Sequence, residues 1–172
     1  HTFSILFNGY TEKKQGEILN NFWRERDSIY VDSGGLQIVT RGISVTDAMK
    51  DEVYKTQAKY GNYGMCFDEI PVWVDGKSIK GDLSSRFYSE ELLEPAARQT
   101  GKNLRRQIDI YKQMDSDCHP ILIVQGNDYD SYMKWVEYVL DELPSGYSDE
   151  IGGIGIGGAA LGKGYLEEFK KC

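Results

Sequence analysis

The stretch Ile29-Tyr30-Val31-Asp32-Ser33-Gly34-Gly35-Leu36-Gln37 decides how the chain is interpreted. Its first three residues are apolar and are typical of the end of a buried strand. Asp32 and Ser33 then bring a carboxylate and a hydroxyl together, and two glycines allow the backbone to turn tightly or to approach a ligand. In parallel α/β proteins, chemistry lies just beyond the C-terminal ends of the strands. A purely structural role stays open, because Asp and Ser also cap turns and helices.

The rest of the chain alternates apolar runs with helical periodicity, which predicts βαβ units and a parallel sheet within one domain spanning residues 1–172. The expected strands cover 3–7, 29–31, 65–67, 120–124 and 152–158, with a further short strand or loop at 36–40. The expected helices cover 18–23, 46–60, 84–114, 128–143 and a segment from 163 onward. Pro95 and Gly101 predict a break in the third of these helices. The fourth is expected to bury Met133, Val136, Leu140 and Leu143.

Composition limits the classes of function. A net charge of −7 argues against a broad basic surface that coats nucleic acid, although a local basic groove stays open. Cys66, Cys118 and Cys172 form no C-x-x-C pair, so we expect neither a disulfide framework nor a zinc site built from them alone, and a reducing, cytoplasmic setting fits. No apolar run reaches membrane-spanning length, and we expect no membrane partner. Because His1 stands first, we expect the sequence to be a fragment.

The last four expected strands all end in polar or glycine-rich residues. These ends are Asp32-Ser33, Asp68-Glu69, Gln125-Gly126 and Gly157-Gly158. Parallel strand ends converge on one edge, so two carboxylates, a carboxamide and glycine N–H groups should face one pocket. The Watson–Crick edge of guanine offers matching groups, with N1–H and N2–H donors beside the O6 acceptor. A sugar or an amide substrate also fits this set.

A competing motif lies near the C-terminus. Gly153-Ile154-Gly155-Ile156-Gly157-Gly158 matches the letters G-x-G-x-x-G of dinucleotide-binding proteins. That motif requires a strand before it and a helix that opens within it, whereas here the apolar strand residues lie inside the motif. The hypothesis that the chain is a nucleotide-dependent oxidoreductase therefore depends on this glycine run alone.

Four motifs occur in the order found in one enzyme family. They are Asp32-Ser33-Gly34-Gly35-Leu36-Gln37, similar to D-S-G-G-F-Q; 65–69, similar to M-A-F-D-E; 123–126, similar to I-V-Q-G; and 156–162, similar to I-G-G-L-A-V-G. On these residues the chain resembles the tRNA-guanine transglycosylases, the queuine/archaeosine tRNA-ribosyltransferase superfamily. The short spacing between the first two motifs is more similar to phage members that insert deazaguanines into DNA.

The resemblance implies a (β/α)8 TIM barrel, of which this chain would be an N-terminal portion of about five βα units. It implies exchange of guanine in tRNA or DNA for a 7-deazaguanine such as preQ0, preQ1 or queuine, through a covalent ribosyl-enzyme intermediate. Asp32 would act as general acid/base and Asp68 would hold the N1/N2 edge of the base. Gln125 and the Gly158 N–H would hold O6. The remaining base-binding residues implied are Ser33, Gln37, Gly157 and Ala159.

Because Asp68 would bind the base in its ionised form, we also expect that the pKa of Asp68 is not raised far.

The chain departs from the family at several points. Leu36 stands where the family has an aromatic residue that stacks on the base. Lys163 stands where the family has a Glu beside the aminomethyl group, which favours a nitrile-bearing base such as preQ0.

The later aspartate that serves the family as nucleophile has no counterpart in this chain, and neither do the Cys-rich zinc ligands expected in a complete family protein. We therefore expect the 172 residues alone not to exchange bases. Asp128 and Asp130 read as the cap of the helix that follows them, and Asp149 and Glu150 precede a strand at the wrong end.

A second hypothesis from another class is a non-catalytic family member that binds nucleic acid or supports a catalytic partner, as a homodimer or a heterodimer. Retention of Asp32, Asp68 and Gln125 together favours the enzyme.

Overall fold

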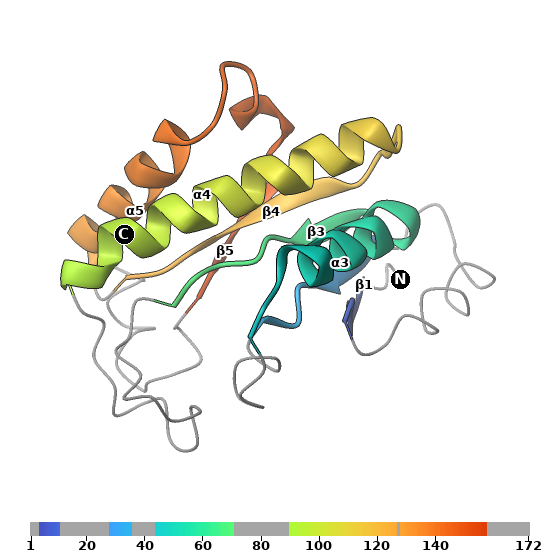
Figure 1. Ribbon diagram of the computed structural model, residues 1–172, viewed down its shortest axis with the longest axis horizontal. Helices are drawn as coiled ribbons and strands as arrows, with labels where there is room; N and C mark the ends of the chain where they lie inside the picture. The colour runs from blue at the N-terminus through green and yellow to red at the C-terminus, as the bar shows by residue number, and fades with distance from the viewer. Residues whose placement is uncertain (1–3, 11–27, 36–43, 71–89, 127, 158–172) are drawn as a thin grey trace.

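The computed structural model describes residues 4–10, 28–35, 44–70, 90–126 and 128–157. These residues form an α/β structure with one five-stranded parallel sheet (Figure 1). The strands are β1 (Ser4–Asn8), β2 (Ser28–Asp32), β3 (Tyr63–Met65), β4 (His119–Val124) and β5 (Gly153–Ile156). Five parallel strands confirm the fold class expected from the alternation of strand and helix patterns.

The strands follow one another across the sheet in sequence order, β1-β2-β3-β4-β5. All four neighbouring pairs are parallel, and the register sets Asn8 beside Asp32 and Val124 beside Ile156. The C-terminal ends of the strands therefore share one edge of the sheet. In the described strands the order never reverses, so the sheet has no switch point of the doubly wound kind.

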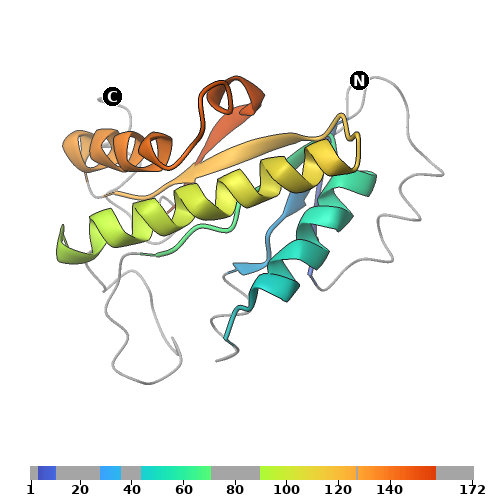
Figure 2. The ribbon, with the colours of Figure 1, turned by 45° about the horizontal axis from the view of Figure 1, so that its top comes forward.

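Three α-helices pack on the sheet within the described ranges: α3 (Asp47–Tyr60), α4 (Glu90–Gln113) and α5 (Tyr129–Asp141). α4 packs against both other helices and lies between them (Figure 2). The Thr46 hydroxyl accepts a hydrogen bond from the Met49 N–H at the start of α3, and Asp128 caps α5 in the same way through the Ser131 N–H. Both caps confirm the sequence prediction, because capping depends on residues only a few positions apart.

The helices cover one face of the sheet. Alternate strand residues on this face are buried in the core with α4 and α5, as Leu122 and Val124 show. The main cluster unites Cys66, Leu93, Ala97, Leu104, Ile108, Leu122, Val124, Trp135 and Val139.

The opposite face carries the other alternate set, which includes Tyr30, Tyr63, Ile121 and Ile123. The rings of Tyr30 and Tyr63 stack there at 4.8 Å between centroids. Asp32 is two residues beyond Tyr30 and so belongs to this second face at the C-terminal edge.

The predicted position of the third strand was wrong. β3 is Tyr63–Met65, whereas we expected this strand at 65–67. A Cβ at Gly64 would overlap the side chains of Gln57 and Tyr111, so α3 and α4 pack directly against the backbone of this strand. The apolar content of the local sequence does not report such packing, and it therefore misplaced the strand.

α4 runs unbroken through Pro95 and Gly101, contrary to the predicted break. Leu93 before the proline and Ala97 after it belong to the same buried cluster, so packing offsets the one backbone hydrogen bond that proline removes. At Gly101 a Cβ would lie 2.8 Å from the Val139 carbonyl oxygen, which shows how closely α5 approaches.

The buried face of α5 also differs from the prediction. Trp135 and Val139 are fully buried, while Met133 and Leu140 are 43% and 39% exposed. The Trp135 indole N–H donates to the Ile123 carbonyl, 3.1 Å away. The large aromatic residue with a backbone partner thus fixes how the helix is rotated, and Val136 and Leu143 are only partly buried.

Several expectations lie outside the described residues: the helix at 18–23, the strand or loop at 36–40 and the helix from 163. In the part of the chain that the structure describes, no helix has both the length and the apolar character needed to cross a membrane.

Candidate functional site

Asp32 ends β2 at the C-terminal edge of the sheet, and a tight turn follows it. The Asp32 carbonyl accepts a hydrogen bond from Gly9 N–H at 3.0 Å, which ties the end of β2 to the residue after β1. Gly34 has a φ of +73°, a conformation that glycine adopts without a steric penalty. A Cβ on Gly34 would also lie 2.8 Å from the Asn8 carboxamide oxygen. The turn after Asp32 therefore requires glycine for both its backbone conformation and its packing.

The surroundings of Asp32 shift the pKa of its carboxyl group. Burial raises the pKa of the Asp32 carboxyl above its usual range, and the backbone N–H groups of Gly34 and Ser33 offset part of that rise. A carboxyl with a raised pKa can release and take up a proton nearer neutral pH, as a general acid/base must.

Asp68 lies in the segment after β3 and contacts the next strand end. The Gln125 amide nitrogen, just past β4, donates a hydrogen bond to the Asp68 carboxylate. The charge of Asp32 acts on Asp68 as well, because it is among the causes that raise the pKa of Asp68. Asp68 and Gln125, which follow β3 and β4, are therefore in direct contact, and the Asp32 carboxylate is near enough to act on Asp68 through its charge.

Burial raises the pKa of Asp68 to about 6, while the hydrogen bond from Gln125 lowers it and the nearby charges of Glu69 and Asp32 raise it further. The expectation that this pKa would not be raised far was wrong. Burial at the packed strand ends cannot be read from the local sequence.

Gly157, just past β5, completes a row across the strand ends. Its N–H donates to the Val124 carbonyl at 2.8 Å, which continues the pairing of β5 with β4. A Cβ on Gly157 would overlap the carboxamide of Gln125. The Gln125 carboxamide is thus held between the Asp68 carboxylate and the Cα of Gly157.

The other predicted site residues are divided. Ser33 is buried, and its hydroxyl oxygen accepts a 3.3 Å hydrogen bond from Gly35 N–H, so it stabilises the turn. Gln37, Gly158 and Ala159 lie outside the described residues, and their predicted roles stay predictions.

Sequence reasoning missed Asn8. It ends β1, pairs in register with Asp32, and its side-chain oxygen accepts a 2.9 Å hydrogen bond from Tyr10 N–H. The Asn8 carboxamide packs on Gly34 and so supports the turn beside Asp32. The Asn-Gly pair at the end of the first strand could have predicted this role, because it puts a polar side chain at a fifth strand end.

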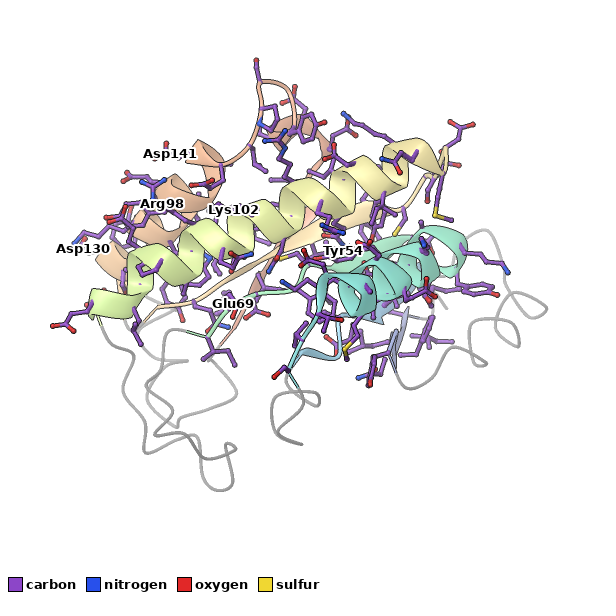
Figure 3. The ribbon with its side chains drawn as sticks, in the orientation of Figure 1. Tyr54, Glu69, Arg98, Lys102, Asp130 and Asp141 are labelled. Carbon is purple, nitrogen blue, oxygen red and sulfur yellow. The ribbon has the colours of Figure 1, made fainter. Side chains whose placement is uncertain are left out.

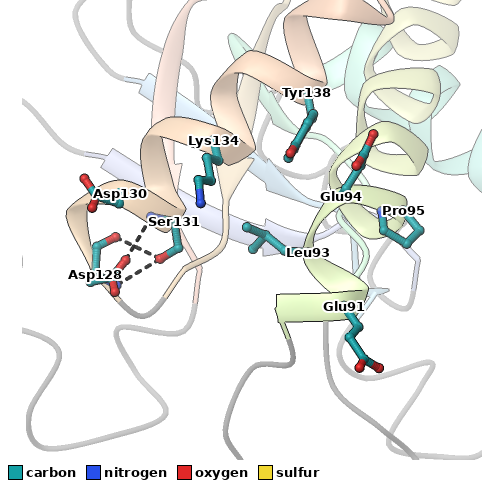
Figure 4. Close-up of a pocket in the computed structure, with 9 residues that line it drawn as sticks. All are labelled: Glu91, Leu93, Glu94, Pro95, Asp128, Asp130, Ser131, Lys134 and Tyr138. Carbon is teal, nitrogen blue, oxygen red and sulfur yellow. Dashed lines mark hydrogen bonds between the residues drawn. The ribbon is translucent and has the colours of Figure 1, made fainter.

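A separate cavity of about 430 Å³ lies between the first turns of α4 and α5 (Figure 4). Its lining includes the carboxylates of Glu91, Glu94, Asp128 and Asp130, together with Lys134. The Asp128 carboxylate already accepts the Ser131 N–H as the helix cap. None of the strand-end residues Asp32, Asp68 and Gln125 lines this cavity, so we locate the candidate site at the sheet edge.

Metal binding has no support in the described ranges, where no three His, Cys, Asp or Glu side chains are grouped to hold an ion. Cys66 and Cys118 are buried free thiols, and burial raises the pKa of the Cys66 thiol. Such a thiol is a core residue rather than a reactive group. The zinc predicted for a complete family protein would need ligands from outside this chain.

The two glycines of the turn should differ in how much an alanine substitution destabilises the fold. Gly34→Ala should destabilise the fold by about 1–3 kcal/mol, because it combines a strained φ with a clash against Asn8. Gly35→Ala is the matched control, since its Cβ would meet Phe67 and Ser33 at an ordinary 3.4–3.5 Å. Urea unfolding of both variants measures the difference, and equal stabilities would contradict the described turn.

No protein-family model matches the chain, and no curated protein matches it.

Proposed function

We propose that this chain contributes the base-binding half of a guanine transglycosylase, which exchanges guanine in tRNA or DNA for a 7-deazaguanine. The observation that carries the proposal is the row Asp68–Gln125–Gly157 beside Asp32 at one sheet edge. The four motifs that resemble the transglycosylase family include these residues.

The row suits the Watson–Crick edge of guanine. An ionised Asp68 offers oxygens to the N1–H and N2–H donors of the base. Gln125 donates to Asp68 through its amide nitrogen, and in the proposal the same amide group donates to O6 of the bound base. In this proposal the hydrogen bond between the two side chains orients both before the base arrives, which reduces the cost of binding.

Asp32 is assigned the general acid/base role. Breaking the glycosidic bond releases guanine, whose ring nitrogen needs a proton from the Asp32 carboxyl. Attack by the incoming base then requires its own ring N–H proton to be removed, and the Asp32 carboxylate accepts it. A retaining exchange also needs a second carboxylate, which forms a covalent bond to the ribose carbon as guanine leaves and is released when the new base attacks. That nucleophile is expected outside this chain.

The sheet supports a barrel as the complete fold. The described strands follow one another in sequence order and the described helices lie on one face, which is the arrangement that a (β/α)8 barrel requires. The opposite face is lined by Tyr30, Tyr63, Ile121 and Ile123, which would then fill the barrel interior. Asp32 would project at the mouth.

The test is incorporation of radiolabelled guanine into tRNA and into DNA by the complete protein that contains this chain. Asp32→Asn should reduce incorporation at least a hundredfold, in line with the usual contribution of general acid/base catalysis, about 10²–10⁴-fold. Asp130→Asn is the matched control, because Asp130 is exposed on α5. Binding of guanine without any incorporation would instead support the non-catalytic subunit.

Guanine binding should depend on the charge of Asp68. Its pKa of about 6 in the free protein leaves it ionised above pH 7 and protonated below pH 5. Only the ionised form accepts both base donors, so affinity should be constant above about pH 7 and fall about tenfold per pH unit below about 6. Equilibrium dialysis with labelled guanine measures the profile, and affinity that stays flat down to about pH 5 would contradict the assigned role.

A further inference from the structure

Asp68 lies in a segment that follows β3 and is not part of any strand. β3 ends at Met65, and the last backbone bond from this segment to β4 is Cys66 N–H to the Ile121 carbonyl, at 3.0 Å. Residues 66–70 are in neither strand nor helix. Something other than strand pairing must therefore fix the direction of the Asp68 side chain.

Two buried side chains of α4 make the missing bonds. The Asn103 amide nitrogen donates to the Phe67 carbonyl at 3.0 Å, and the Thr100 hydroxyl accepts from the Glu69 N–H at 2.9 Å. Glu69 accordingly lies alongside the part of α4 that contains Lys102 (Figure 3). The Phe67 carbonyl and the Glu69 N–H belong to the two peptide units that meet at the Asp68 Cα. Fixing both units fixes the backbone dihedrals of Asp68.

The orientation of Asn103 is itself determined. Its side-chain oxygen accepts hydrogen bonds from the Lys50 ammonium at 2.8 Å and the Gln99 amide at 3.1 Å. Because two donors converge on the oxygen, the nitrogen must face the Phe67 carbonyl. Asn103 and Thr100 are 3% and 0% exposed, so water does not replace these bonds.

We propose that Thr100 and Asn103 are positioning residues that aim the Asp68 carboxylate at Gln125 and at the bound base. This inference rests on the proposed function for the identity of the base. The positioning itself concerns the free protein and can be tested without any reaction.

Two variants remove the bonds with little change in shape. Thr100→Val is isosteric and removes the acceptor for Glu69 N–H. Asn103→Asp keeps an oxygen for Lys50 and Gln99 but cannot donate to Phe67 when ionised. Thr100→Ser restores the hydroxyl and should rescue. The matched control is Thr56→Val, since Thr56 is also buried and its hydroxyl donates to the Glu52 carbonyl within α3, at 2.8 Å.

The readouts are the NMR titration of the Asp68 carboxyl carbon and the dissociation constant for guanine, both in the complete protein. Burial is the main cause that raises the pKa of Asp68. If loss of these hydrogen bonds exposes the Asp68 side chain to water, the midpoint of its titration should fall below about 6. Neighbouring titratable groups are Asp32 and Glu69, with the Lys50 charge behind Asn103.

We expect Thr100→Val to lower that midpoint, and we expect both Thr100→Val and Asn103→Asp to weaken guanine binding about tenfold. The midpoint is compared in Thr100→Val alone, because the new carboxylate of Asn103→Asp would itself raise the pKa of Asp68. Thr56→Val and Thr100→Ser should change neither quantity. A midpoint that stays at about 6 in Thr100→Val would overturn the positioning role. If the unaltered protein fails to bind guanine, the proposed function is wrong, and the NMR midpoint still decides the positioning role.

Discussion

Asp68→Asn should abolish guanine exchange and at the same time make the folded protein more stable at neutral pH. Exchange is lost because the amide presents a donor to the donors of the base, and each buried group left unpaired costs about 1–3 kcal/mol. That cost corresponds to roughly a tenfold to hundredfold loss for each group. The gain in stability arises because burial raises the pKa of Asp68, so the folded state disfavours its charge.

The sign of the pH effect follows from this shift. The folded pKa of about 6 lies above the ordinary value of 3.8, so the folded state binds the Asp68 proton more tightly than the unfolded state does. The free energy of unfolding should therefore fall as the pH rises from about 4 to about 6, by about 1–3 kcal/mol from this group. Asp68→Asn removes that fall.

Urea unfolding from about pH 4 to about pH 8 measures the stability, beside the labelled-guanine assay. Asp130→Asn serves as the exposed control and should leave the assay unchanged. A gain in stability together with lost exchange excludes misfolding as the cause of the loss. An Asp68→Asn protein that still exchanges guanine would contradict the assignment of Asp68 to the base.

Gly157→Ala should strongly weaken guanine binding. The added methyl group would overlap the Gln125 carboxamide, which must then leave its position against Asp68. Both the side-chain hydrogen bond and the proposed contact to O6 are lost, so we expect guanine affinity to fall about a hundredfold, which corresponds to about 3 kcal/mol. Stability should fall much less, because Gln125 lies at the end of β4 rather than within the helical core.

Gly153→Ala is the matched control in the same strand. Its Cβ would meet only the terminal methyl group of Ile121, at 3.1 Å, and that flexible end can move by a few tenths of an ångström. Affinity for guanine, measured by equilibrium dialysis, should therefore separate the two alanine variants. Equal affinities would show that Gln125 does not need its described position.

The sequence by itself determined the elements whose signals are local. The apolar runs of β2 and β4 and the Thr46 and Asp128 caps depend on residues a few positions apart, and the structure has them where they were expected. The sequence also indicated that Asp68 and Gln125 would meet, because parallel strands bring their C-terminal ends to one edge of the sheet.

Tertiary structure alone decided what depends on contacts between distant segments. The continuity of α4 through Pro95 follows from one shared core cluster on both sides of the proline, and the rotation of α5 follows from Trp135. Thr100 and Asn103 bond to a segment more than thirty positions away in the chain. The pKa of Asp68 likewise depends on burial by neighbours from several elements, because desolvation and hydrogen bonding are set by which segments pack together rather than by sequence spacing.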